Sequence, residues 1–193
     1  MLMASSIIFR DRSMIKGVLI AMALTIGAAS AANAQVGNSA PKEKLVMETT
    51  KGKVVIALRP DLAPQHVARA KQLASEGFYD GIIFHRVIEG FMAQTGCPDG
   101  RGTGGSKYPN LKQEFNAEPH VRGTASMARA QSPDSANSQF FICFTDAPFL
   151  KKQYTVWGKV VEGMENIDQI KRGEPVINPD KMVSVKVAAD IAA

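Results

Sequence analysis

An arginine and a glutamine stand inside an otherwise apolar stretch of this chain, and they are its strongest candidates for chemistry. The stretch reads FHRVIEGFMAQTG over residues 84–96 and contains Arg86 and Gln94. Arginine stays protonated and carries a rigid fork of N–H donors, so on an apolar strand it needs solvent or an acceptor. Two interpretations are open from the pattern alone. Arg86 is either an outward-facing side chain paired with a surface carboxylate or a fixed cationic donor at a site.

Strand alternation sorts the side chains around this arginine. Neighbouring residues of a strand point to opposite faces, so we expect Phe84, Arg86 and Ile88 on one face and His85 and Val87 on the other. His85 is then expected to be a hydrogen-bonded histidine of the barrel interior, in preference to a catalytic base.

Other reactive residue types do not form a recognisable site. Ser126 and Ser138 lack the elbow motif of a serine hydrolase. The run GRGTGG at 100–105 has the glycines of a nucleotide-binding loop, but no strand leads through it directly into a helix, so it is predicted to be a surface loop. The histidines show no metal-ligand spacing, so we expect neither a metal nor a cofactor. The chain's three histidines are His66, His85 and His120.

Two cysteines are present, Cys97 in a turn-rich segment and Cys143 within the run FFICF. Neither belongs to a Cys-x-x-Cys motif or stands beside a histidine, which disfavours redox catalysis. We favour two free thiols, while a single bridge between them stays open.

Short apolar runs separated by turn residues dominate the chain and predict eight strands. Two segments show helical spacing, and in the first of them Asp61 is a capping-type residue and Pro64 suits a first helical turn. Many short strands with two helices favour an antiparallel sandwich or barrel over a parallel sheet. The expected strands are 45–49, 53–58, 82–88, 91–95, 123–128, 139–145, 155–161 and 182–188, and the expected helices are 63–76 and 162–172.

The N-terminal segment has the pattern of a secretory signal. Basic residues precede an apolar run of about 13 residues, shorter than the roughly 20 that span a bilayer, and Ala32-Asn33-Ala34 offers a small-x-small cleavage site. We therefore expect a signal peptide over 1–34, cleavage near Ala34, and a periplasmic or secreted protein. A short membrane anchor or a buried helix is the alternative.

The remaining chain has the composition of one globular domain. The whole chain has 193 residues, of which 45% are hydrophobic and 21% charged, which is typical of a folded protein. The leader holds three of the 23 Lys and Arg and one of the 18 Asp and Glu, so its removal lowers the net charge from +5 to +3. That excess disfavours nucleic-acid binding. We expect a flexible tail over 35–44 and one domain over 45–193.

Several of these motifs together resemble the cyclophilin family of peptidyl-prolyl isomerases. The resemblance covers about 45–188 in uninterrupted order, and the agreement of separate motifs makes it specific. It implies a mainly β fold, a closed eight-stranded antiparallel β-barrel capped by two α-helices, with an outer groove that binds proline-containing peptide. The motifs are FHRVIEGFMAQTG, GTGG at 102–105, GTASMA at 123–128, SQFFIC at 138–143 and FLKKQYTVWGKV at 149–160.

The resemblance also implies roles for residues at matching positions. It implies that Arg86, Gln94 and Phe91 are catalytic residues. Alternation supports part of the groove, because Gln139, Phe141 and Cys143 share one face while the core is expected on the opposite face, with Phe140, Ile142 and Phe144. The implied substrate-binding residues are Met92, Gly102, Ala128, Gln139, Phe141, Phe149, Leu150 and Tyr154.

Three positions depart from many eukaryotic members of the family. This chain has Phe149 in place of a tryptophan, Tyr154 in place of a histidine and Arg129 in place of an asparagine. Similar changes are typical of exported bacterial cyclophilins. Loss of the indole N–H removes a donor used to hold cyclosporin, so weak cyclosporin binding is expected without loss of catalysis.

The implied reaction needs no bond breaking. Rotation about an X-Pro bond returns lone-pair density to the proline nitrogen, and a donor aimed there binds the twisted amide better than either planar form. We expect an isomerase acting on proline-containing segments of unfolded or folding exported proteins, monomeric and without stable membrane association after cleavage. The alternative is a proline-peptide-binding chaperone module with incidental turnover.

Overall fold

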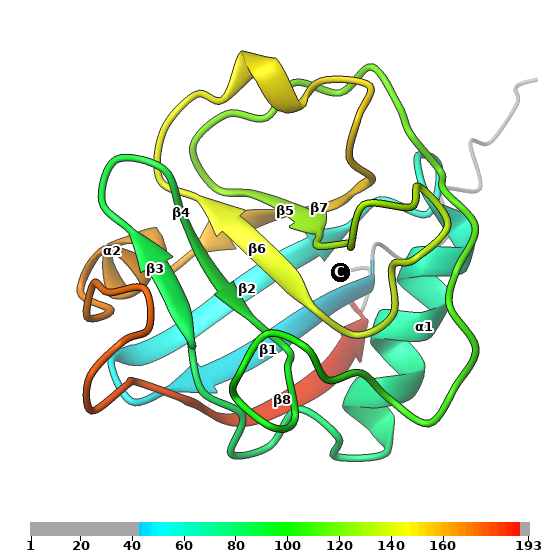
Figure 1. Cartoon of the computed structure of the whole chain (residues 1–193). Coiled ribbons are helices and arrows are strands. Elements are labelled where there is room, and N and C mark those ends of the chain that lie inside the picture. Colours follow the sequence, from blue (N-terminus) through cyan, green and yellow to red (C-terminus); the bar gives the residue numbers. More distant parts are fainter. Residues whose placement is uncertain (1–42, 190–193) are drawn as a thin grey trace, which may run out of the picture. The chain divides into compact units, whose positions relative to one another are not determined.

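The computed structural model describes residues 43–189, which form a mainly β unit with an eight-stranded antiparallel sheet and two α-helices (Figure 1). The expected leader lies outside the described residues. The expected tail does too, except that Glu43 and Lys44 already belong to the first strand. The strands are β1 Glu43–Thr49, β2 Gly52–Leu58, β3 Arg86–Ile88, β4 Met92–Thr95, β5 Thr124–Met127, β6 Phe140–Cys143, β7 Val156–Glu162 and β8 Met182–Ala189. The helices are α1 Pro64–Ser75, the 3-10 helix η1 Pro148–Leu150 and α2 Met164–Asp168.

The sheet is open, which corrects the expected closed barrel. Its strand order is β3-β4-β6-β5-β7-β2-β1-β8, so β3 and β8 are the two edges of a half-barrel. Ile83 and Lys181 meet in an isolated bridge near these edges, but no ladder joins β3 to β8 in the described residues. The reason is local, because within the expected strand 82–88 only Arg86–Ile88 form a ladder, and that ladder is with β4.

The main hydrophobic core lies against the inner face of this sheet. Trp157 of β7, Phe140 of β6 and Tyr79 are packed edge to face, with ring centroids 5.4 Å apart for Phe140 and Trp157 and 5.7 Å for Tyr79 and Phe140. Such aromatic pairs bury large apolar areas and add about 0.5–1.5 kcal/mol beyond that burial. The core therefore fixes the inner face of β6, whose outer face carries the site described below.

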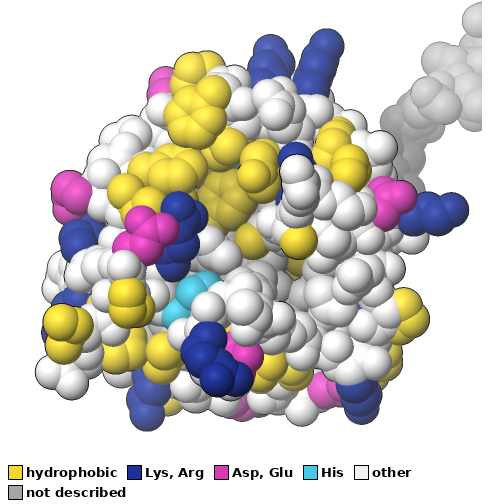
Figure 2. All heavy atoms as spheres, viewed as in Figure 1, with side chains coloured by type: hydrophobic (Ala, Val, Ile, Leu, Met, Phe, Trp, Pro, Cys, Tyr) yellow, Lys and Arg dark blue, Asp and Glu magenta, His cyan; other side chains and the backbone are white. Residues whose placement is uncertain are grey.

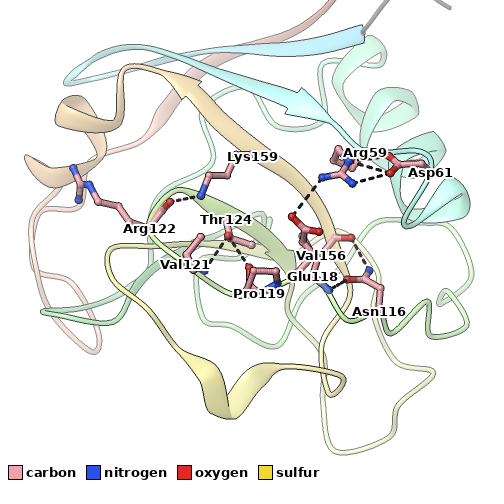
Figure 3. Close-up of polar contacts among 10 residues, drawn as sticks. All are labelled: Arg59, Asp61, Asn116, Glu118, Pro119, Val121, Arg122, Thr124, Val156 and Lys159. Carbon is pink, nitrogen blue, oxygen red and sulfur yellow. Dashed lines mark hydrogen bonds and ion pairs between the residues drawn. The ribbon is translucent and has the colours of Figure 1, made fainter. Parts of the chain in front are cut away.

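Helix α1 closes one side of the core and begins as expected at a proline (Figure 1). It packs on β8 and β7, and Val67, Ala70, Leu73 and Ala74 are buried, as their spacing predicts. Asp61 does not cap the helix. Its carboxylate instead accepts a 2.7 Å bond from Nη2 of Arg59 (Figure 3).

A distant carboxylate satisfies the start of α1. The backbone N–H groups of Gln65 and His66 both donate to the Glu114 side chain, each at 3.1 Å. The first turn of a helix leaves N–H groups without internal partners and carries partial positive charge, so an acidic side chain stabilises it. This cap is invisible to local sequence patterns because Glu114 is 48 residues beyond His66.

Helix α2 packs against β2 and is shorter than the expected 162–172. It begins after Gly163, whose φ of +78° places it in the left-handed region that favours glycine. A Cβ at this position would lie 2.0 Å from the carbonyl oxygen of Lys53, so the helix start fits tightly against β2. Ile167 and Ile170 are buried as expected, although Ile170 lies beyond the helical turn.

The segment before β5 runs beside β7 and is held by side-chain contacts with backbone groups (Figure 3). The Asn116 amide donates to the carbonyl of Val156 at 3.0 Å. The backbone N–H of Val121 donates to the Thr124 hydroxyl at 3.1 Å. The two contacts lie on either side of His120 in the sequence. In residues 43–189 no helix is both long and apolar enough to cross a membrane.

Candidate functional site

A second apolar cluster lies on the outer face of β4 and β6, separate from the main core. Phe141 and Cys143 belong to this outer cluster, whereas Phe140, Ile142 and Phe144 belong to the inner core. The alternation predicted for β6 is therefore confirmed. The buried members are Met92, Phe141, Cys143, Ala147 and Leu150, and Ile88, Phe91, Ala128 and Tyr154 pack around them.

This cluster forms the floor and walls of a recess of about 420 Å³. Phe141 lies edge to face against Tyr154, with ring centroids 5.8 Å apart, and Phe91 lies 5.5 Å from Phe149. Figure 2 shows apolar side chains gathered around a hollow on this face, with basic side chains near it. The recess is lined by Arg86, Phe91, Met92, Gln94, Ala128, Arg129, Phe141, Phe149, Leu150, Gln153 and Tyr154.

The strand register places a row of polar side chains along one edge of the recess. Arg86 of β3 pairs in register with Gln94 of β4, and Nη1 of Arg86 contacts Oε1 of Gln94 at 3.4 Å. The Gln94 amide then donates to Oε1 of Gln139 at 3.0 Å. We call Arg86, Gln94 and Gln139 the polar row. It joins the neighbouring strands β3 and β4 to Gln139, which lies 45 residues beyond Gln94.

The polar row ends on the glycine-rich loop 100–105, here called the glycine loop. The Gln139 amide donates to the carbonyls of Gly102 at 2.9 Å and Gly104 at 2.8 Å. This loop lines a second hollow of about 740 Å³, which shares Gln94, Ala128 and Arg129 with the recess. The two hollows are therefore neighbours along one face.

The structure brings all eleven predicted site residues to these two hollows. Nine of them line the recess, and Gly102 and Gln139 line the second hollow. Their roles in binding or catalysis stay predictions.

Arg86 agrees with parts of both interpretations, because it is paired with a carboxylate and also lies at the recess. Its Nε donates to the carboxylate of Glu174, forming an ion pair, and its side chain also lines the recess. The Arg86 side chain is 37% exposed, so the ion pair is not buried. The guanidinium thus keeps access to the recess while one of its donors is engaged.

The alternation predicted around Arg86 is wrong at Phe84 and His85. Because β3 begins at Arg86, Phe84 is not in register with it and packs in the inner core beside Val87. His85 lines a hollow together with Arg86 and Glu174. Both ring nitrogens of His85 are buried without a hydrogen-bond partner among the described residues, so the expected hydrogen-bonded histidine is not found. Burial lowers the pKa of His85 and favours its neutral form.

The thiol of Cys97 organises the glycine loop. Its Sγ accepts the backbone N–H groups of Gly102 at 3.2 Å and Gly104 at 3.3 Å, and it donates to Oδ1 of Asp99 at 2.8 Å. This thiol bond, together with the N–H of Arg101, lowers the pKa of Asp99 to about 2. Cys97 and Cys143 are both free and buried, as favoured from the sequence.

His120 supports the recess from behind. Its ring stacks on Phe141 with centroids 6.2 Å apart, and Nε2 lies 3.0 Å from the Ser126 hydroxyl. Burial lowers the pKa of His120 to about 4, so the ring is neutral near pH 7. Burial also raises the pKa of Cys143 to about 12, which makes its thiol a packing group at neutral pH.

Arg129 joins two segments of the rim. Its guanidinium carbon lies 4.7 Å from the ring centroid of Tyr154, and Nε donates to the carbonyl of Gln153 at 3.2 Å. From the sequence, Arg129 is only a departure from a family pattern, whereas Tyr154 is also predicted to bind substrate. Gln153 and Glu174 were missed. Gln153 is next to Tyr154, but Glu174 is separated from Arg86 by 88 residues and had no local signal.

The site therefore offers an apolar recess with a cationic hydrogen-bond donor at its edge. Such a surface can bind an apolar ring and donate to a group beside it. In residues 43–189 no group of three or more His, Cys, Asp or Glu side chains is placed to hold a metal ion.

Comparison with known proteins identifies relatives over nearly the whole described unit. Residues 44–188 match the family model described as cyclophilin type peptidyl-prolyl cis-trans isomerase/CLD. A probable peptidyl-prolyl cis-trans isomerase of Brucella suis is 51% identical over 88% of this chain and 92% of the relative. Peptidyl-prolyl cis-trans isomerase B of Bacillus subtilis is 46% identical over 63% of this chain and 85% of the relative.

Solved structures show the same fold. Cyclophilin AquaCyp293 from Hirschia baltica has a TM-score of 0.70 and 30% identity, covering 77% of this chain and 75% of its own. A cyclophilin type peptidyl-prolyl cis-trans isomerase of Cryptosporidium parvum, solved in the presence of the dipeptide Ala-Pro, has a TM-score of 0.71 and 26% identity. The similarity covers 76% of this chain and 99% of the Cryptosporidium chain.

Proposed function

Because this chain belongs to the cyclophilin-type peptidyl-prolyl cis-trans isomerases, we propose that Arg86 and the recess beside it carry its isomerase activity. In this proposal the recess holds the proline ring and Arg86 donates to the proline nitrogen when the peptide bond is twisted. The observation that carries the proposal is the placement of a half-exposed guanidinium at the edge of an apolar recess.

The chemistry follows from the electronic structure of the amide. A planar X-Pro bond delocalises the nitrogen lone pair, and its rotational barrier is roughly 18–20 kcal/mol. When the bond turns by about 90°, the lone pair returns to nitrogen and becomes a hydrogen-bond acceptor. A cationic donor fixed at that place stabilises the twisted state more than either planar state, which is the condition for catalysis.

The apolar residues hold the proline ring in place while the peptide bond rotates. Met92, Phe141 and Leu150 are at most 6% exposed, so they form a fixed floor for the proline ring. Gln94 contacts both Arg86 and Gln139, and in this proposal it holds a peptide carbonyl. If the ring is held on one side, the flanking peptide on the other side turns.

The energetic demand is moderate. Each 1.36 kcal/mol removed from the barrier accelerates exchange tenfold, so lowering it by about 7 kcal/mol gives about five powers of ten. One preorganised donor commonly contributes a factor of about 100 to 1,000. The recess and the polar row supply further contacts.

We further propose that the substrates are proline-containing segments of exported proteins. Support comes from the basic, apolar and small-residue pattern of the first 34 residues, which is typical of a signal peptide. The proposal requires that this protein is itself exported and loses its leader. N-terminal sequencing of the protein recovered from the cell envelope tests that requirement. We expect a start at Gln35, whereas an intact leader in that fraction would contradict it.

The mechanism is tested by the isomerisation rate of a short Ala-Pro peptide. Arg86→Ala should reduce kcat/KM about 100-fold or more, because the donor to the proline nitrogen is lost. Arg122→Ala is a matched control, since Arg122 is also half-exposed and paired with a carboxylate, that of Asp168, but lines neither hollow. Equal rates for wild type and Arg86→Ala would contradict the proposed mechanism.

A further inference from the structure

Glu174 is the acidic partner of Arg86 and comes from the loop between α2 and β8. We propose that Glu174 is a positioning residue for the isomerase reaction and acts by holding the Arg86 guanidinium in its working orientation. This inference rests on the proposed function of Arg86. It assigns a catalytic consequence to a loop carboxylate that contacts Arg86 but does not itself line the recess.

Backbone pairing delivers Glu174 to this place. The N–H of Val87 donates to the carbonyl of Gly173 at 2.8 Å, and the N–H of Gly173 donates back to the carbonyl of Val87 at 2.8 Å. Two residues after Glu174, the N–H of Val176 donates to the carbonyl of His85 at 3.2 Å. The loop is thus bonded to the residues on both sides of Arg86, and Glu174 lies between these attachment points.

Gly173 makes this close pairing possible. Its φ is +155°, and a Cβ there would lie 2.7 Å from the carbonyl oxygen of Pro175. That oxygen belongs to the backbone, so a side chain at this position would force the loop to shift. The carboxylate of Glu174 is therefore placed by the course of the main chain, and its position does not depend on flexible side-chain contacts alone.

The hydrogen bonds that Arg86 donates show why its contact with Glu174 matters. Nε is engaged by Glu174, while the contact of Nη1 with Gln94 is 3.4 Å long and weak. A free arginine side chain samples many rotamers, and a donor that must be ordered during the reaction loses catalytic effect. The contact with Glu174 is charge-assisted and is the stronger of the two, so Glu174 contributes the larger share of the orientation.

A second effect of Glu174 opposes the first. Its negative charge weakens the field of the guanidinium at a developing lone pair. The Glu174 side chain is 57% exposed, however, and solvent screens charges at such sites. The orienting effect of Glu174 should therefore outweigh its weakening of the guanidinium's field. Removal of the Glu174 charge is thus expected to lower the isomerisation rate.

A neighbouring ion pair provides a matched control. Nε of Arg172 donates to Oε2 of Glu89 at 2.6 Å, and this pair joins the same loop to the β3–β4 turn. Glu89 is 76% exposed and lines neither the recess nor the hollow beside Arg86. Glu89→Gln loosens the same loop in the same chemical way without touching Arg86.

The experiment compares wild type, Glu174→Gln, Glu89→Gln and Arg86→Ala. It measures the isomerisation rate of an Ala-Pro peptide, the affinity for that peptide by NMR titration, and the Nε–Hε resonance of Arg86. We expect Glu174→Gln to lower the on-enzyme rate about threefold to tenfold, as suits an exposed pair, with peptide affinity within about twofold. The Arg86 Hε signal should move toward the position of free arginine, and Glu89→Gln should resemble wild type.

An unchanged or higher rate in Glu174→Gln, or an equal loss in Glu89→Gln, would overturn the positioning role. Loss of peptide affinity that accounts for the whole rate change would also overturn it. These outcomes are distinct from failure of the proposed function, which is reported by Arg86→Ala retaining the wild-type rate.

Discussion

Phe149 is the most exposed aromatic side chain at the recess, with 63% of its surface accessible. It follows Pro148 in η1 and contacts Phe91 at the rim, so it covers the recess with an apolar ring that has no hydrogen-bond donor. A ligand that needs an N–H at this position finds none there.

Phe149→Trp should therefore strengthen inhibition by cyclosporin, because the indole restores a donor at the rim. One net hydrogen bond is worth about 1 kcal/mol, which corresponds to about fivefold tighter inhibition. The inhibition constant is measured with wild type and variant under the same assay, and kcat/KM for the Ala-Pro peptide should change little. Wild-type inhibition already as tight as that of the tryptophan variant would contradict this explanation.

Individual site residues were predictable where motif and alternation agreed, as at Phe141 on the outer face of β6. Glu174 was not, because a charged loop residue has no periodicity and its contact with Arg86 spans 88 residues. His85 was misplaced because alternation applies only where a strand is in register, and β3 begins one residue later.

The Gln139 side chain joins several segments around the site. It connects the start of β6 to the glycine loop through two carbonyls and to β4 through Gln94. Because loops of this kind are mobile unless their polar groups are engaged, Gln139 should control the order of the second hollow.

Gln139→Leu should weaken peptide binding about threefold to tenfold, since three hydrogen bonds are lost at the edge of the groove. Amide hydrogen exchange of the glycine loop should become faster, while exchange within α1 should not change. Gln169→Leu, on the exposed residue that follows α2 as its C-cap, serves as the control. Unchanged loop exchange and peptide affinity in Gln139→Leu would rule out this role for Gln139.

The existence of the strands and of both helices was predictable from short apolar runs and helical spacing. Their arrangement was not. The position of β7 between β5 and β2 depends on pairings between distant segments, and the expected closure fails because β3 pairs over only three residues. Helix α2 stops after five residues, although apolar spacing continues to Ile170.

The whole molecule buries all three of its histidines. His66 is 0%, His120 1% and His85 6% exposed, and burial lowers the pKa of each. The unfolded chain, with histidine pKa values near 6.5, therefore binds more protons than the folded chain at mildly acidic pH. Stability contributed by the neutral rings is fully present above about pH 6.5 and falls as the pH drops below it.

For His120 the fall continues to its folded pKa of about 4. As the pH falls from 7 to 4.5, we expect the titration of this ring alone to lower the free energy of unfolding by about 2–3 kcal/mol. Urea unfolding of wild type and His120→Gln across this range measures it. The variant starts from a different stability at pH 7, so the comparison is between slopes, and the slope of the variant should be shallower. Equal slopes would show that His120 is not the group that titrates.

The most direct test of the account separates catalysis from binding at Arg86. Exchange spectroscopy on a proline peptide gives the cis–trans rate on the enzyme and the dissociation constant from the same samples. For Arg86→Ala we predict an on-enzyme rate reduced at least about 100-fold, with peptide affinity within about threefold of wild type. Retention of the wild-type exchange rate without this guanidinium would contradict the account.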